Sequence, residues 1–130
     1  MATSPSRKTK QRDALRAVLA RAERPLSIGE LLDAASKSVD GLGVATVYRA
    51  VDAFLKERSI EAVEVAGEPV RYERAGKEHH HHFQCERCDR LFDIGGCIDN
   101  LRKLAPRKFS VRSHAVTLYG LCASCSHQNP

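Results

Sequence analysis

Two Cys-x-x-Cys pairs constrain this chain more than any other feature. They are Cys85 with Cys88, and Cys122 with Cys125. A structural Zn²⁺ takes four ligands in a closed tetrahedron, and thiolate sulfur suits it well. Two tight turns from distant parts of a chain can close such a site, and the 33 residues between the pairs exceed the spacing of a compact zinc ribbon. The pairs therefore predict a zinc ion that holds a small domain together.

Two other interpretations of these cysteines are a pair of disulfides and a thioredoxin-like redox motif. The chain shows no signal peptide and no long apolar run, so we expect a cytoplasmic protein that spans no membrane. Cytosolic cysteines are kept reduced, which favours metal binding over disulfides.

Positive charge is concentrated at the start of the chain. The net charge is +5, and residues 1–24 hold seven Lys and Arg against Asp13 and Glu23. Residues 25–130 hold fourteen charges of each sign, so the whole excess lies in the first segment. A concentrated basic segment is what contact with a nucleic-acid backbone requires. The alternative is a solvated tail and helix face.

Apolar residues recur at helical spacing in three stretches of the first half. One lies before Pro25, one after Ser27 and one after Gly43. Ser27 and Glu30 form an S-x-x-E capping box, which predicts the start of the second helix.

A hairpin follows the three helices. Residues 60–65 alternate apolar and polar side chains, and residues 70–73 return after a Gly-Pro turn. Three helices and a hairpin predict a winged helix-turn-helix, in which the third helix enters the DNA major groove. A winged helix used only for protein contacts is the alternative. The candidate DNA-contacting residues are Arg12, Ala45, Thr46, Tyr48 and Arg49.

Four histidines, His79 to His82, lead into the first cysteine pair. Alternate residues of a strand point to opposite faces, so His80 and His82 share one face and the other two share the opposite one. One strand can thus supply two metal sites. An expression tag or a solvated strand would be the alternatives.

Further ligands are predicted on both faces of the histidine strand. Glu73 ends the hairpin and lies just across a short hinge from His80 and His82. For the opposite face, His114 is available on a strand predicted over 110–118, with Cys97 or Asp99 near the start of a short helical pattern. Cys97 could equally be a buried small hydrophobe.

The motifs together resemble the ferric uptake regulator family of bacterial metal-responsive repressors over nearly the whole chain. The resemblance rests on Gln11-Arg12, on the run from Gly43 to Arg49, on Arg71-Tyr72-Glu73, on the histidine run, and on Leu118-Tyr119-Gly120 before the second cysteine pair. It implies an α+β protein with a winged helix-turn-helix domain over 1–74, a hinge over 75–78, and a small α/β metal-binding and dimerisation domain over 79–130. It also implies a homodimer that a regulatory metal closes onto AT-rich inverted repeats in promoters.

The resemblance assigns residues to two regulatory sites. Glu73, His80 and His82 would line a hinge site, and His79, His81 and His114 a second site. The family's hinge site often takes a further histidine where this chain has Pro25, so the site would be completed by Glu61, by Glu64, by a water or by no further ligand. In the second site, some members have an aspartate where His81 stands, and Cys97 or Asp99 falls near the place of a glutamate.

These departures replace oxygen donors by imidazole and thiolate, and softer donors favour Zn²⁺ over Fe²⁺ or Mn²⁺. The sequence therefore predicts a repressor of the zinc uptake regulator branch, controlling zinc uptake genes. An iron-sensing regulator is the first alternative, followed by a peroxide sensor and a zinc-binding carrier. We expect no enzyme, because the chain has neither HExxH nor a deaminase motif.

Overall fold

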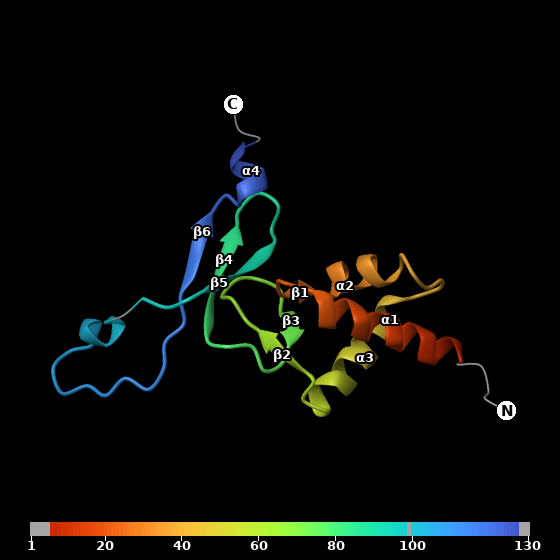
Figure 1. Ribbon diagram of the computed structural model, residues 1–130, viewed down its shortest axis with the longest axis horizontal. Helices are drawn as coiled ribbons and strands as arrows, with labels where there is room; N and C mark the ends of the chain where they lie inside the picture. Colours follow the sequence, from red (N-terminus) through yellow and green to blue (C-terminus); the bar gives the residue numbers. More distant parts are fainter. Residues whose placement is uncertain (1–5, 99, 128–130) are drawn as a thin grey trace. The chain divides into compact units, whose positions relative to one another are not determined.

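The computed structural model describes residues 6–98 and 100–127. The chain forms two compact units, the first ending at Gly76 and the second beginning at Lys77 (Figure 1). This boundary falls within the stretch 75–78 that the sequence predicts as a hinge.

Helix α1, Arg7–Arg21, opens the first unit. Its N-cap is Ser6, whose hydroxyl accepts a hydrogen bond from the backbone N–H of Thr9 at 3.1 Å and so satisfies one of the free donors of the first turn. The apolar stripe predicted for this helix faces the core, since Leu15 and Leu19 are fully buried.

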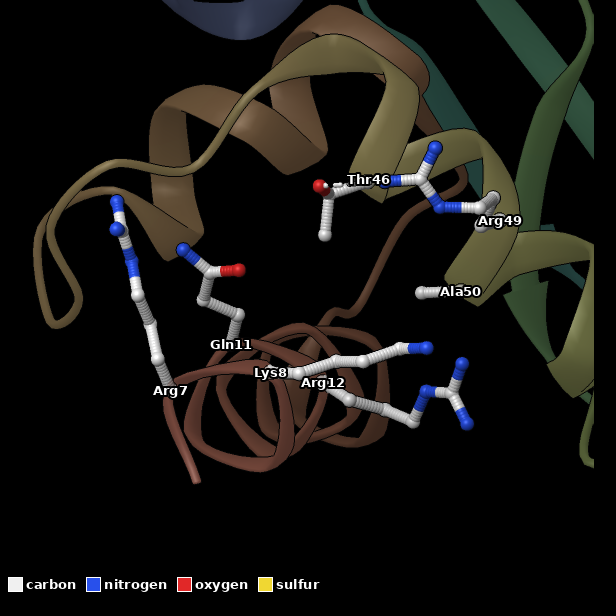
Figure 2. A pocket seen from close by; sticks show the side chains of 7 residues that line it. All are labelled: Arg7, Lys8, Gln11, Arg12, Thr46, Arg49 and Ala50. Atoms are coloured by element: carbon white, nitrogen blue, oxygen red, sulfur yellow. Dashed lines mark hydrogen bonds between the residues drawn. The ribbon is translucent and has the colours of Figure 1, made fainter. Parts of the chain in front are cut away.

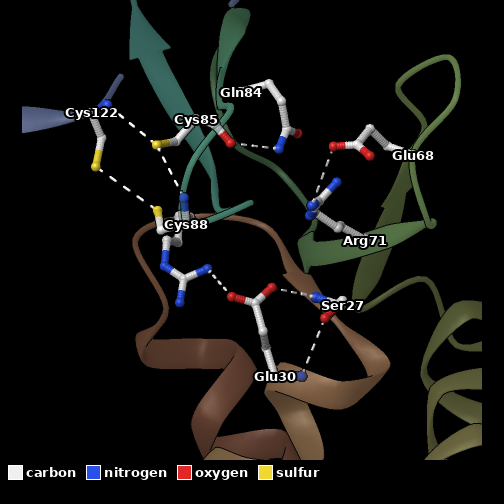
Figure 3. A network of polar contacts seen from close by, with 9 residues as sticks. Ser27, Glu30, Glu68, Arg71, Gln84, Cys85, Cys88 and Cys122 are labelled. Carbon is white, nitrogen blue, oxygen red and sulfur yellow. Dashed lines mark hydrogen bonds and ion pairs between the residues drawn. The ribbon is translucent and has the colours of Figure 1, made fainter. Parts of the chain in front are cut away.

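Helix α2, Ile28–Ala35, begins at the predicted capping box. The Ser27 hydroxyl accepts from the Glu30 N–H at 3.2 Å, and the Glu30 carboxylate accepts from the Ser27 N–H at 3.1 Å (Figure 3). Arg24 adds an ion pair to the same carboxylate. The start of this helix was therefore predicted correctly from two residues.

Helix α3, Val44–Lys56, carries the predicted recognition surface. One face packs into the core through Val47, Ala50, Val51 and Phe54, while Tyr48 on the other face is half exposed. An amphipathic helix of this kind is held by its apolar face and presents its polar face to a partner.

Three short strands complete the winged helix. Strands β1, Leu26–Ser27, and β2, Ile60–Val63, both pair antiparallel with β3, Arg71–Arg74, which lies between them. The predicted hairpin is present, but β2 ends two residues early. The carbonyl of Val65 accepts the Glu68 N–H at 3.0 Å, so this residue belongs to the turn although its side chain is buried.

The second unit is built on the histidine strand. Strand β4, His80–Cys85, is central, with β5, Leu91–Gly95, antiparallel on one side and β6, Thr117–Gly120, parallel on the other. A short helix α4, Ala123–His127, follows. The sequence analysis did not predict β5 or α4.

The strand predicted over 110–118 was wrong in its first seven residues, because β6 begins only at Thr117. The carbonyl of Val116 still accepts from the His82 N–H at 3.1 Å, but its own N–H donates to the imidazole Nδ1 of His81. The His81 side chain thus accepts from the Val116 backbone N–H, the donor that would otherwise have extended the hydrogen-bond ladder between β4 and β6.

The helical pattern predicted before Pro106 is only a 3₁₀ turn, Leu101–Leu104. Leu104 is 81% exposed and Ile98 is 62% exposed, so the described residues of this unit do not bury the apolar face that a longer amphipathic helix needs. Among the described residues, no helix has the length and apolar character needed to cross a bilayer.

Candidate metal sites and nucleic-acid interface

The four paired cysteines converge where β4 and β6 end. Figure 3 shows three of them, Cys85, Cys88 and Cys122. The parallel ladder pairs Cys85 with Gly120, so Cys122 follows two residues later beside the first pair. The sulfurs of Cys88 and Cys122 lie 3.9 Å apart. A zinc tetrahedron with bonds of about 2.3 Å has a sulfur–sulfur edge of about 3.8 Å. The cluster therefore fits a four-coordinate zinc ion.

Backbone N–H donors favour the metal-binding thiolate form of one cysteine in this cluster. The N–H groups of Cys122 and Cys88 both point at the sulfur of Cys85, at 3.4 and 3.5 Å. They lower the pKa of the Cys85 thiol to about 6, which makes it a thiolate near neutral pH. Burial raises the pKa of Cys125 to about 12, so a cation is needed before all four sulfurs can ionise together. All five cysteines are free of disulfide bonds.

A second cluster lies on one face of β4 and contains three histidines and the fifth cysteine. Nε2 of His79 lies 3.2 Å from Nε2 of His81 and 3.3 Å from Nε2 of His114. The sulfur of Cys97 lies 2.9 Å from Nε2 of His114 and 3.4 Å from that of His81. Four donor atoms thus meet: His79 just before β4, His81 on β4, Cys97 in the loop after β5 and His114 in the loop before β6.

His81 is the buried member of this cluster, and its surroundings keep it neutral. Burial, followed by the neighbouring imidazoles, lowers its pKa below the ordinary value. Its Nδ1 accepts from the Val116 N–H at 3.1 Å, so the proton of the neutral ring is on Nε2. Ligation through Nε2 requires that proton to leave or to move to Nδ1, which couples metal binding to the segment that leads into β6.

A third cluster lies on the opposite face of β4. Nε2 of His80 and Nε2 of His82 lie 3.5 and 3.4 Å from Oδ1 of Asp93 on β5. Lys77 holds the other carboxylate oxygen at 2.6 Å. Nδ1 of His80 donates to the Glu78 carbonyl at 2.7 Å, which orients the ring with Nε2 toward Asp93. Oδ1 is buried and accepts no hydrogen bond from the described residues, so a cation at this point would satisfy it.

Asp93 was not among the predicted ligands, although a signal for it exists in the sequence. Once Cys85 and Arg90 are taken as the two ends of a tight turn, residues equally distant from the turn must face each other. His82 lies three residues before Cys85 and Asp93 three after Arg90, and the two are paired across the ladder.

The other predicted ligands are placed as follows. Glu73 lies on β3 of the first unit, paired with Glu61 on β2. Glu61 and Glu64 are both exposed, and neither belongs to a donor cluster of the described residues. Asp99 lies outside the described residues.

A basic groove lies between α1 and α3 (Figure 2). Its lining residues are Arg7, Lys8, Gln11 and Arg12 from α1, and Thr46, Arg49 and Ala50 from α3. The described lining therefore has four cations and no carboxylate. Of the predicted DNA-contacting residues, the structure brings Arg12, Thr46 and Arg49 together here, while Ala45 and Tyr48 are exposed on α3. The sequence analysis did not single out Arg7 and Lys8 as contacts.

Two side chains of this groove also fix the loop that leads into α3. Nε2 of Gln11 donates to the Asp40 carbonyl at 3.1 Å, and Arg7 donates to the Gly41 carbonyl at 3.4 Å. Gly41 has φ +71°, and a Cβ there would collide with the Arg7 guanidinium. Next to them, Arg49 donates to the Thr46 hydroxyl at 3.1 Å. The groove is thus held in shape by the protein itself.

Comparison with known proteins gives one consistent family. Residues 4–119 match the model of the ferric uptake regulator family. The chain is 28% identical over 90 residues to the ferric uptake regulation protein of Campylobacter jejuni, a match that covers 67% of this chain and 57% of that protein. It is 28% identical over 129 residues to the zinc uptake regulation protein of Mycobacterium tuberculosis, covering 96% and 98%.

Solved structures give the same result. The structure of the Helicobacter pylori ferric uptake regulator, described as having three functional metal-binding sites, is similar with a TM-score of 0.68 and 25% identity, over 95% of this chain and 82% of that one. A zinc uptake regulator complexed with zinc and DNA is similar with a TM-score of 0.52 and 25% identity, over 91% and 82%.

Proposed function

The chain belongs to the ferric uptake regulator family, and we propose that it is a cytoplasmic, zinc-responsive transcriptional repressor that binds AT-rich inverted repeats as a homodimer and controls zinc uptake genes. One observation carries this proposal. Three donor clusters lie along β4 or at its ends, and the other unit of the chain has a groove lined by four cations. One unit has the chemistry of a metal sensor, and the other has that of a DNA reader.

The three clusters take different roles in this proposal. The four cysteines hold a structural zinc, because a closed thiolate tetrahedron leaves no position open for exchange. The two histidine clusters hold regulatory metal. Glu73, which follows Arg71-Tyr72 at the end of the wing, is proposed as a further ligand beside His80 and His82, so that metal binding joins the DNA-binding unit to the metal-binding unit. Glu61 or Glu64 was expected to complete the hinge site, and in this proposal Asp93 completes it instead.

Support for a homodimer comes from the second unit. Strand β6 lies at the edge of its sheet, and both Leu118 and Tyr119 on it are about half exposed. Phe109 and Leu104, in the segment before it, are 70% and 81% exposed. An open strand edge beside exposed large apolar side chains is a surface that a second copy would cover.

Two observations support zinc as the regulatory metal. The zinc uptake regulation protein of M. tuberculosis matches nearly the whole of both chains, and the cluster of His79, His81 and His114 is built on imidazole, which suits zinc. Iron is the alternative, because two histidines and one carboxylate, as at His80, His82 and Asp93, are also a donor set of Fe²⁺.

The proposal is tested by capture of sheared genomic DNA from the source organism on the purified protein under anaerobic conditions. The three arms contain buffered Zn²⁺, Fe²⁺ or no added metal. Enrichment of AT-rich inverted repeats near zinc transporter genes with Zn²⁺ alone is the expected result. Enrichment with Fe²⁺ beside iron-uptake genes would assign the protein to iron, and no enrichment in any arm would refute a DNA-binding regulator.

A variant then tests which cluster is the switch. In the double variant His80→Ala, His82→Ala we expect a folded protein whose affinity for the enriched duplex, measured by fluorescence anisotropy, no longer rises with Zn²⁺. His127→Ala is the matched control, because this histidine is exposed and belongs to none of the described clusters. A metal response retained by the double variant would place the switch on the other face of β4.

A further inference from the structure

Cys97 differs from the other four cysteines in both position and surroundings. It is exposed, as Cys88 also is, but its sulfur faces imidazole nitrogens instead of other sulfurs. We propose that the Cys97 thiolate is the fourth ligand of the cluster of His79, His81 and His114, and that it sets the preference of this site for Zn²⁺ over Fe²⁺ and Mn²⁺. The inference rests on the proposed function only in taking this cluster as a regulatory metal site.

The geometry brings the sulfur to the position of a ligand. Gly96, with φ +86°, turns the chain at the end of β5 and delivers the next residue to the face of β4 that carries His81. The sulfur lies within 3.4 Å of two ring nitrogens, and the four donor atoms all lie within 4.8 Å of one another. A cation placed among them would be bound by three nitrogens and one sulfur.

The chemistry of the fourth donor decides which cation is preferred. Thiolate is a soft ligand that favours Zn²⁺, whereas carboxylate favours harder cations such as Mn²⁺. The cluster on the opposite face has Asp93 in the corresponding role. One cluster thus has three imidazoles and a thiolate, and the other has two imidazoles and the Asp93 carboxylate, so the two sites should differ in metal preference.

The first test uses Co²⁺ as a spectroscopic probe. The protein carries His80→Ala and His82→Ala, so that the opposite face cannot bind, and its four-cysteine site is filled beforehand with one equivalent of Zn²⁺. Anaerobic addition of Co²⁺ should then produce a sulfur-to-cobalt charge-transfer band in the near ultraviolet. The same protein with Cys97→Ser should show no such band, while circular dichroism confirms that it is folded.

The second test measures selectivity by competition. Zn²⁺ affinity in Cys97→Ser should fall at least about 10-fold, the lower bound for loss of a supporting residue at a metal site. Cys97→Asp should still bind Co²⁺ without the band and should shift the ratio of Zn²⁺ to Mn²⁺ affinity toward Mn²⁺.

Three outcomes would overturn the inference. They are a charge-transfer band that persists in Cys97→Ser, Co²⁺ binding to the parent protein without a band, and an unchanged Zn²⁺ to Mn²⁺ ratio in Cys97→Asp. None of these measurements involves DNA, so a failure here is distinguishable from failure of the proposed repressor function. Zinc-dependent DNA binding could survive in Cys97→Ser even when the band is lost.

Discussion

The basic groove allows the salt dependence of DNA binding to be worked out in advance. Four cations line it in each protomer, namely Arg7, Lys8, Arg12 and Arg49. Each phosphate contact contributes about −0.9 to the slope of log K against log salt concentration. If every cation meets one phosphate, the slope is about −3.6 for one protomer and about −7.2 for a dimer on two half-sites.

Arg12→Ala should remove one such contact per protomer. The slope for the dimer should change from about −7.2 to about −5.4, since two contacts are lost. Raising the salt concentration from 50 to 150 mM should therefore lower the DNA affinity of the parent protein by about 3.4 orders of magnitude and that of Arg12→Ala by about 2.6. Fluorescence anisotropy titrations at five or six salt concentrations, with Zn²⁺ buffered throughout, would measure both slopes.

Lys56→Ala is the matched control for this experiment. Lys56 is exposed and ends α3, ten residues and so about 15 Å along the helix axis from Thr46 in the groove. Its removal should leave the slope unchanged. An Arg12→Ala slope equal to that of the parent protein, or an equal change in Lys56→Ala, would refute the assignment of the groove as the phosphate-contacting surface.

Three further predictions concern stability. Cys122→Ser should remove the structural zinc and abolish the cooperative unfolding of the second unit, because the binding energy of a structural zinc is folding energy; hydrogen exchange of the β4 and β6 amides would report this, and native protection would contradict it. Phe54→Ala should lower the unfolding free energy of the first unit by about 3–5 kcal/mol, because the ring is fully buried; chemical denaturation checks it, and a loss below about 1 kcal/mol would mean that the site is not packed as described. Burial lowers the His81 pKa, so as the pH falls through the ordinary value of 6.5 the unfolded chain takes up a proton before the folded one does. The metal-free second unit should therefore lose stability below that pH. His81→Ala should flatten this pH dependence of the unfolding free energy, and an unchanged pH profile in that variant would refute the reasoning.

The elements that the sequence predicted correctly are those with local causes. The capping box of Ser27 and Glu30, the apolar stripe of α1 and the alternation of β4 are each set by residues close together in the chain. The four-cysteine cluster was predictable because two short motifs each specify a turn and zinc requires both. The two faces of the histidine run follow from the period of a strand alone.

The features that were missed depend on contacts between distant segments. Strand β5 and Asp93 are the exception, because they pair with β4 across the short turn from Cys85 to Arg90 and could have been found by counting outward from that turn. Strand β6 is shortened because the His81 imidazole takes the Val116 N–H, a competition between side chain and backbone that no periodicity reveals. The predicted helix after Cys97 is reduced to a 3₁₀ turn because the described residues of the unit leave Ile98 and Leu104 exposed.

Four consecutive histidines, three of them in β4, raise a question of register. A slip of β4 by one residue against β5 and β6 would exchange its two faces, yet histidines would still stand on both, so the histidines alone cannot distinguish the native alignment from the shifted one. What distinguishes them lies at the end of the strand, where Cys85 must meet the backbone donors of Cys88 and Cys122. In the proposed function, a metal bound by the four cysteines would fix the end of β4 and with it the alignment of both histidine clusters. A protein that folded without it could bind metal through the same side chains in the wrong combination.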